Sequence, residues 1–259
     1  MNSEDLAQKN RKEQFGDHAS PLTETDPEFV TYFENFAFGE VIAQTTLPPR
    51  LRLIFTLGAL IGCQALTDFR IMLDAALNVG VTPIEAKEVI YQAVPYVGIG
   101  KAVDFIVATN EVLTSRGVTL PLSGQSTTTR ENRQEKGYAV QGEIIGFETL
   151  KKMYATAPSD LMHIQHFLSA NCFGDHYTRS GLDIQTRELL TLAILAAHGG
   201  CDPQVRGHVG ANLNVGNGRA VMIDMFTQLL PFIGYPRTLN AIAALNAVVP
   251  AAEAHKSND

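Results

Sequence analysis

The sequence lacks the features of several large protein classes. No apolar run approaches the roughly 18 residues that a membrane-spanning helix needs, and the polar start, residues 1–11, has no apolar stretch typical of a signal peptide. Charged residues make up 18% of the chain, the net charge is -7, and lysine and arginine form no cluster. Because nucleic-acid binding depends on concentrated positive charge, we expect a cytoplasmic protein that binds a small molecule or another protein, and neither nucleic acid nor membrane.

Cysteine is also scarce, and the alternation typical of strands is nearly absent. The three cysteines, Cys63, Cys172 and Cys201, are an odd number without CxxC spacing, which indicates reduced thiols rather than a disulfide framework or a zinc site. Apolar residues instead recur at helical spacing, which predicts an all-α protein. We expect helices over about 26–37, 49–62, 66–78, 100–115, 158–171, 184–198, 203–214 and 235–248, a helix starting near Pro83, and one containing residues 222–230.

The chain contains an internal duplication. Residues 75–80 (AALNVG) return 136 positions later as residues 211–216 (ANLNVG), with five of six residues identical. The register then continues without a gap, so that residues 95–98 (PYVG) correspond to residues 231–234 (PFIG). A repeat of about half the chain predicts two homologous units.

The duplication extends upstream with one residue of slippage. Residues 38–40 (FGE) match residues 173–175 (FGD), and Arg52 matches Arg187. Between the copies lies a stretch rich in glycine, proline, serine and threonine, which is typical of a solvated linker. We therefore expect a first domain over residues 1–120, a linker over 116–130 and a second domain over 131–259.

The two copies differ in the residues that could move protons. At the position of His208 the first copy has Met72, and at the position of Glu188 it has Leu53. Glu188 and His208 lie on helices joined by a short turn, so they could approach across the hairpin. A carboxylate that fixes the tautomer of an imidazole favours general acid–base chemistry. The alternative is a surface glutamate favoured by the helix dipole, with a histidine at the edge of the core.

Cys201 is a second candidate. It precedes a helix N-terminus and lies seven residues before His208, an environment that can lower a thiol pKa and make the sulfur nucleophilic. The alternative is a small residue that fills a tight turn. A metal site is not expected, because the histidines of the second copy have no carboxylate at a recognisable ligand spacing. These histidines are His163, His166, His176, His198 and His208.

Several segments of the second copy resemble the carboxymuconolactone decarboxylase family. They are residues 173–183 (FGDHYTRSGLD), 187–190 (RELL), 206–208 (RGH), 213–216 (LNVG) and 234–237 (GYPR), which together span essentially that whole copy. The first copy resembles a diverged member through residues 49–52 (PRLR), 75–80 and 96–98 (YVG). The chain is thus similar to a tandem two-domain member of this family.

The resemblance implies an all-helical, alkylhydroperoxidase D-like fold, for which we expect two tandem units related by a pseudo-twofold axis. Single-domain relatives form rings, so a trimer of fused pairs is expected. The resemblance also implies that His208, Glu188 and Arg179 line the active pocket. We add Arg237 and His176 as further candidates for substrate binding.

The leading functional hypothesis is a cofactor-independent decarboxylase acting on a small carboxylated lactone, as in protocatechuate breakdown. His208 would return a proton to the carbanion, Glu188 would orient His208, and Arg179 or Arg237 would hold the substrate carboxylate. Thiol enzymes of the same superfamily have a CxxC pair. In this sequence Cys201 stands at the position of the first sulfur of that pair, and Gln204 stands at the position of the second. The alternatives are therefore a one-cysteine peroxidase or thiol oxidoreductase using Cys201, and a ring-forming binding protein without turnover.

Overall fold

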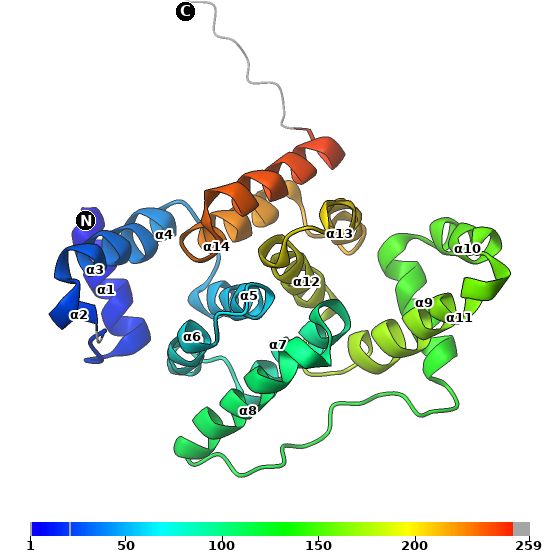
Figure 1. Cartoon of the computed structure of the whole chain (residues 1–259), viewed down its shortest axis with the longest axis horizontal. Coiled ribbons are helices and arrows are strands. Elements are labelled where there is room, and N and C mark those ends of the chain that lie inside the picture. Colours follow the sequence, from blue (N-terminus) through cyan, green and yellow to red (C-terminus); the bar gives the residue numbers. More distant parts are fainter. Residues whose placement is uncertain (1, 21, 251–259) are drawn as a thin grey trace, which may run out of the picture.

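The computed structural model describes residues 2–20 and 22–250, and helices are the only regular structure in them. The prediction of an all-α protein is confirmed. The first copy contains α1 (Ser3–Phe15), α2 (Leu22–Thr25), α3 (Pro27–Glu34), the π-helix η1 (Asn35–Glu40), α4 (Val41–Ala43), α5 (Pro49–Gly62), α6 (Leu66–Asn78), α7 (Pro83–Val97) and α8 (Ile99–Ser115) (Figure 1). The second contains α9 (Arg133–Ile145), α10 (Phe147–Thr156), the 3-10 helix η2 (Ser159–Leu161), α11 (Met162–Phe167), the π-helix η3 (Leu168–Tyr177), α12 (Ile184–His198), α13 (Asp202–Asn214) and α14 (Arg219–Val248).

Helix boundaries follow local sequence signals. Thr82 and Glu85 form a reciprocal capping box at the start of α7, and Gly98 ends that helix with φ of 79°. At the corresponding position of the second copy, Gly234 has φ of 78° and interrupts α14. A positive φ of this size favours glycine. The same break therefore divides α7 from α8 and separates the two halves of α14.

Helices α1, α9 and α10 were not expected from the hydrophobic pattern. Helix α1 is polar, and its buried positions are Ala7, Asn10 and Gln14, so no apolar stripe marks it. Tertiary contacts hold α1 against η1 and α9 against η3. These approaches require glycine, because a Cβ on Gly39 would lie 2.4 Å from the carbonyl oxygen of Ser3. Gly174 approaches α9 in the same way.

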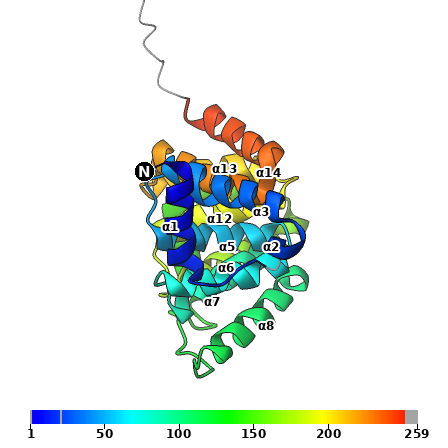
Figure 2. The ribbon, with the colours of Figure 1, turned by 90° about the vertical axis from the view of Figure 1, so that its left-hand side faces the viewer.

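The centre of the molecule is built from both copies. Helix α5 packs against α12, α7 packs against α12, and α14 packs against α5, so that equivalent helices make reciprocal contacts. One hydrophobic core runs through both copies. Figure 2 shows α12 and α5 at mid-height, with α13 and α14 above and α7 and α8 below. The pseudo-twofold relation itself stays a prediction, which superposition of residues 30–115 on 160–248 would test.

The remaining helices lie at the two ends of the molecule. Helices α1 to α4 form one end and helices α9 to α11 form the other (Figure 1). The segment between α8 and α9 joins the first copy to the second without helical structure. Residues 251–259 of the predicted second domain lie outside the described residues, and the domain boundaries stay predictions. In the described part of the chain, no helix combines the length and apolar character needed to cross a membrane.

Candidate functional site

Glu188 and His208 are in direct contact. Nδ1 of His208 lies 2.8 Å from Oε2 of Glu188. The Glu188 side chain is fully buried and that of His208 is 16% exposed, so the interpretation of Glu188 as a surface residue is wrong. Asn212 joins the two helices at this level, because its Nδ2 donates to the carbonyl oxygens of both Glu188 (3.1 Å) and His208 (2.8 Å).

The contact determines which imidazole nitrogen is available. An ionised carboxylate only accepts hydrogen bonds, so Nδ1–H of His208 donates to Glu188 and Nε2 is not engaged by this contact. A carboxylate in this position also stabilises the imidazolium that forms when the ring takes up a proton. Oε1 of Glu188 is buried and has no hydrogen-bond partner among the described residues. The pair can therefore hold and release a proton at Nε2.

The first copy contributes to this site through Tyr96 of α7. The Tyr96 ring meets the His208 ring edge to face, with 5.5 Å between centroids. The Tyr96 hydroxyl oxygen lies 2.9 Å from that of Tyr177 on η3, which in turn lies 2.8 Å from Oγ1 of Thr191. A chain of hydroxyl groups from both copies thus runs beside the Glu188–His208 pair.

The hydroxyl chain is neutral. Burial raises the pKa of Tyr96 and of Tyr177 well above the usual tyrosine value. Burial also raises the pKa of the neighbouring Cys172 thiol to about 12; its sulfur lies 3.9 Å from the Tyr96 hydroxyl oxygen. These groups are hydrogen-bond donors and not bases at neutral pH.

Tyr96, Tyr177 and Cys172 were missed by the sequence analysis. A signal for Tyr96 exists in the duplication, because the residue at its position in the second copy is Phe232, which has the ring without the hydroxyl. In the upstream part of the duplication, which is shifted by one residue, Cys172 corresponds to Ala37 of the first copy. The comparison of copies that singled out His208 would have found these residues too.

Arg179 is held by a glutamate of the first copy. Its Nε lies 2.9 and 3.0 Å from the two carboxylate oxygens of Glu88, and its guanidinium stacks on the Tyr91 ring at 5.0 Å. The fully buried Arg187 donates to Glu88 as well, at 2.8 Å. Arg187 also donates to Gln92, whose Nε2 reaches Thr191 at 3.1 Å. Hydrogen bonds therefore link the Arg179 region to the hydroxyl chain.

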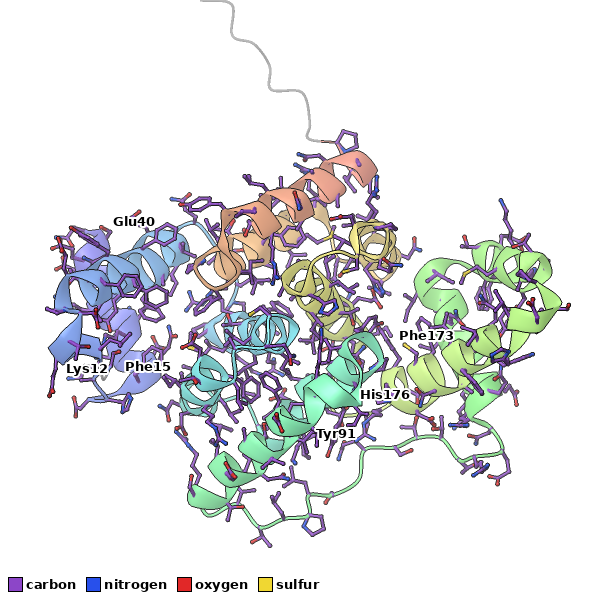
Figure 3. The ribbon with its side chains drawn as sticks, in the orientation of Figure 1. Lys12, Phe15, Glu40, Tyr91, Phe173 and His176 are labelled. Atoms are coloured by element: carbon purple, nitrogen blue, oxygen red, sulfur yellow. The ribbon has the colours of Figure 1, made fainter. Side chains whose placement is uncertain are left out.

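The other two candidates for substrate binding have other surroundings. Arg237 donates to the carbonyl oxygen of Ala197. His176 lies on η3 of the second copy, near Tyr91 on α7 of the first copy (Figure 3). Burial lowers the pKa of His176, which favours the neutral ring. Their roles in binding a substrate stay predictions.

The surroundings of Cys201 do not activate its thiol. The sulfur donates to the carbonyl oxygen of Leu195 at 3.3 Å. Burial, and secondarily the charge of Asp202, raise the pKa of Cys201 despite the opposing effect of Arg237. The thiol is therefore protonated at neutral pH. In the described part of the chain, histidine, cysteine and carboxylate side chains form no group of three or more that could hold a metal ion.

The arrangement of two equivalent helical units, with a Glu–His pair in one of them, agrees with the resemblance seen in the sequence. The model of the carboxymuconolactone decarboxylase family matches residues 27–111 and again residues 163–247. The chain belongs to the carboxymuconolactone decarboxylase family. The two matches make it a tandem member, with one match inside each copy.

Individual relatives are distant. The chain is 29% identical over 106 residues to the 4-carboxymuconolactone decarboxylase of Acinetobacter baylyi, an alignment that covers 41% of this chain and 78% of that protein. It is 28% identical over 96 residues to the nitrosuccinic acid decarboxylase npaB of Metarhizium robertsii, covering 37% of this chain and 65% of the relative.

A solved structure has the same fold over nearly the whole length. It is described as a candidate gamma-carboxymuconolactone decarboxylase subunit from Burkholderia xenovorans LB400. The likeness covers 96% of this chain and 98% of that chain, with a TM-score of 0.54 and 21% sequence identity. Because the sequence identity is low, this likeness supports the fold of the present chain and nothing about its activity.

Proposed function

We propose that this protein is a decarboxylase that acts on a small carboxylated lactone without a cofactor. Membership of the carboxymuconolactone decarboxylase family and two relatives named as decarboxylases support the reaction class. The observation that carries the proposal is the contact between His208 and the fully buried Glu188. The first copy has Met72 and Leu53 at these positions, so the proton-transfer pair occurs in one copy alone.

The chemistry needs one proton transfer. When the carbon–carbon bond to the carboxylate breaks, carbon dioxide leaves and the electron pair remains on carbon, delocalised into the unsaturated lactone. His208, charged and held by Glu188 through Nδ1, then donates its Nε2 proton to that carbon. Glu188 stabilises the imidazolium before the transfer, and water returns a proton to the ring afterwards.

The neighbouring neutral hydroxyls suit a developing anion. Tyr96 brings a buried aromatic ring and a hydroxyl beside His208, and such a hydroxyl stabilises negative charge without accepting a proton. Hydrogen bonds link the Arg179 region to the same hydroxyl chain through Arg187 and Gln92. Arg179 and Arg187 share the single carboxylate of Glu88, so positive charge exceeds negative charge there. This surplus and the connection favour Arg179 over Arg237 as the residue that orients the substrate carboxylate.

The proposal is tested by decarboxylation of carboxymuconolactone with the intact chain and with His208→Ala. We expect His208→Ala to lower kcat/KM by roughly 10² to 10⁴, the range for loss of a general acid. The matched control is His163→Ala, which removes an exposed histidine from α11 and should leave the rate unchanged. Equal, measurable rates for His208→Ala and the intact chain would exclude His208 as the proton donor, and no turnover by the intact chain would favour a binding protein.

A further inference from the structure

The first copy contains a cavity of about 310 Å³. One wall comes from α1, α3 and η1, and the opposite wall comes from α6 and the start of the break in α14. Figure 3 shows Phe15 on the side of α1 that faces α6. The apolar lining includes Phe15, Phe29, Phe33, Phe38, Met72 and Phe232.

This cavity occupies the place of the candidate site in the other copy. Met72 corresponds to His208, Phe232 corresponds to Tyr96, and Phe38 corresponds to Phe173. Protein interiors leave few voids larger than a water molecule. A cavity at the lower end of the size range of small-molecule sites therefore lies at the place that corresponds to the candidate site.

Aromatic rings dominate the walls. The Phe33 ring meets the Phe38 ring at 6.0 Å and the Phe232 ring at 6.1 Å between centroids, in both cases edge to face. Phe15 meets Phe38 at 5.3 Å, and Phe29 stacks on Phe33 at 6.4 Å while 59% of Phe29 stays exposed. Rings in such arrangements offer faces and edges to a further aromatic ring.

The one arginine at the rim is already paired. Nε of Arg11 lies 2.8 Å from Oε1 of Glu34, and Nη2 of Arg11 donates to the carbonyl oxygen of His18 at 2.6 Å. Asp68 adds a negative charge to the lining. Its one arginine is already paired and Asp68 leaves an excess of negative charge, so the cavity disfavours an anionic ligand.

We propose that this cavity is a second ligand site, which binds a small uncharged aromatic molecule with its ring among the phenylalanines and a polar substituent at the Arg11–Glu34 rim. The site is distinct from the Glu188–His208 site and carries no acid–base pair. It therefore binds without turnover, and its existence does not depend on the proposed decarboxylase activity.

The test is isothermal titration calorimetry of the intact chain with 4-methylphenol and with 4-methylbenzoate. The two probes share ring and methyl group, and differ in that the first is neutral at pH 7 and the second is an anion. We expect saturable binding of 4-methylphenol and at least tenfold weaker binding of 4-methylbenzoate. Met72→Trp, which fills the cavity, should weaken 4-methylphenol binding at least tenfold, while His208→Ala should leave it unchanged.

A second variant keeps the test decisive if Met72→Trp fails to fold. Phe29→Ala removes a largely exposed ring from the cavity mouth, and it should weaken 4-methylphenol binding at least threefold. Its matched control is Phe167→Ala, which removes a ring that is 60% exposed in the second copy and should have no effect. Binding that His208→Ala abolishes and Met72→Trp leaves intact would overturn the proposal, as would the absence of saturable 4-methylphenol binding.

Discussion

At the scale of single residues, the contact between Glu188 and His208 has a cost for stability. Glu188 is fully buried, and its Oε1 has no hydrogen-bond partner among the described residues. Replacing a buried charged pair by apolar residues of similar volume is often neutral or stabilising, by up to about 4 kcal/mol. The first copy shows which apolar residues fit the equivalent positions, namely Leu53 and Met72.

We predict that the double variant Glu188→Leu, His208→Met unfolds at a higher temperature than the intact chain and loses decarboxylase activity. The gain should be about 1 kcal/mol or more, because the buried charges and the unpartnered Oε1 atom of Glu188 are then removed. Thermal unfolding followed by circular dichroism measures it. The single variant His208→Met is the control: it leaves Glu188 buried and unpaired, and should destabilise the protein. A double variant less stable than this single variant would contradict the argument.

The cysteines give a second prediction at this scale. Only the thiolate is alkylated, and burial raises the pKa of Cys201, and that of Cys172 to about 12. The thiolate fraction of Cys201 at pH 7.5 is therefore below that of an ordinary cysteine, and it rises as the pH approaches the raised pKa. We expect iodoacetamide to modify Cys201 at least tenfold more slowly in the folded chain than in the guanidinium-unfolded chain, with Cys172 unmodified below pH 10.

Peptide mass spectrometry after timed labelling measures both rates, and the unfolded chain provides the reference for each thiol. Faster labelling of Cys201 in the folded state than in the unfolded state would reveal an activated thiolate. That outcome would move the thiol peroxidase hypothesis ahead of the decarboxylase. If Cys201→Ser then lost hydroperoxide turnover while His208→Ala stayed active, Cys201 would be the more important of the two residues for catalysis.

At the scale of helices, predictability depends on whether a helix is marked by its own sequence. The bounds expected for residues 49–62, 66–78 and 184–198 coincide with α5, α6 and α12. Apolar residues run through each segment, Pro49 begins α5, and the capping residue Asp183 precedes α12. Helix α9 buries Gly137, Gln141 and Gly142 beside Ile144, so its sequence lacks a continuous stripe. Its position is determined by packing against η3, which only the folded chain reveals.

The same limit applies to the candidate site. Glu188 and His208 could be singled out because the two copies differ at these positions. The contact of Tyr96 with His208 joins α7 of the first copy to α13 of the second, and no local spacing rule relates them. The hydroxyl chain through Tyr177 likewise depends on how the copies pack. The Glu188–His208 pair was therefore predictable and its neutral surroundings were not.

Close packing of α5 on α12 gives a prediction about glycine. A Cβ on Gly62 would lie 2.5 Å from the backbone carbonyl oxygen of Ile194, which cannot move without shifting α12. We expect Gly62→Ala to lower the free energy of unfolding by about 1–3 kcal/mol. Gly210→Ala in α13 is the control, because its Cβ would meet nothing within 4 Å; it should stabilise the helix by about 0.5–1 kcal/mol. Urea titration measures both, and equal effects would show that the α5–α12 contact is looser.

At the scale of the whole molecule, the tandem arrangement keeps the site complete. Tyr96, Gln92 and Glu88 of the first copy all reach residues of the second, so covalent linkage maintains the contacts of the hydroxyl chain at any protein concentration. The first copy thus serves the Glu188–His208 site although it lacks the pair itself. The chain is expected to associate further, because the resemblance to ring-forming relatives implies a trimer.

The surface offers a place for that association. Ile99 and Val103 on α8 are 60% and 44% exposed, and the residues 136 positions later, Tyr235 and Leu239 on α14, are 60% and 59% exposed. Apolar residues four apart form a stripe along one helix face, and here each copy exposes an equivalent stripe. Exposed apolar stripes of this kind mark protein–protein contacts. We predict that they pack between neighbouring chains of a trimer.

Light scattering tests the assembly directly. The intact chain should give the mass of three chains of 28.2 kDa, and Leu239→Asp should shift that mass toward a single chain, because a carboxylate buried in an apolar contact loses its hydration without gaining a partner. Leu161→Asp is the matched control, since Leu161 is 51% exposed and lies away from both stripes; it should leave the trimer intact. A mass of one chain for the unmodified protein at every concentration would exclude the ring and assign the stripes to another partner.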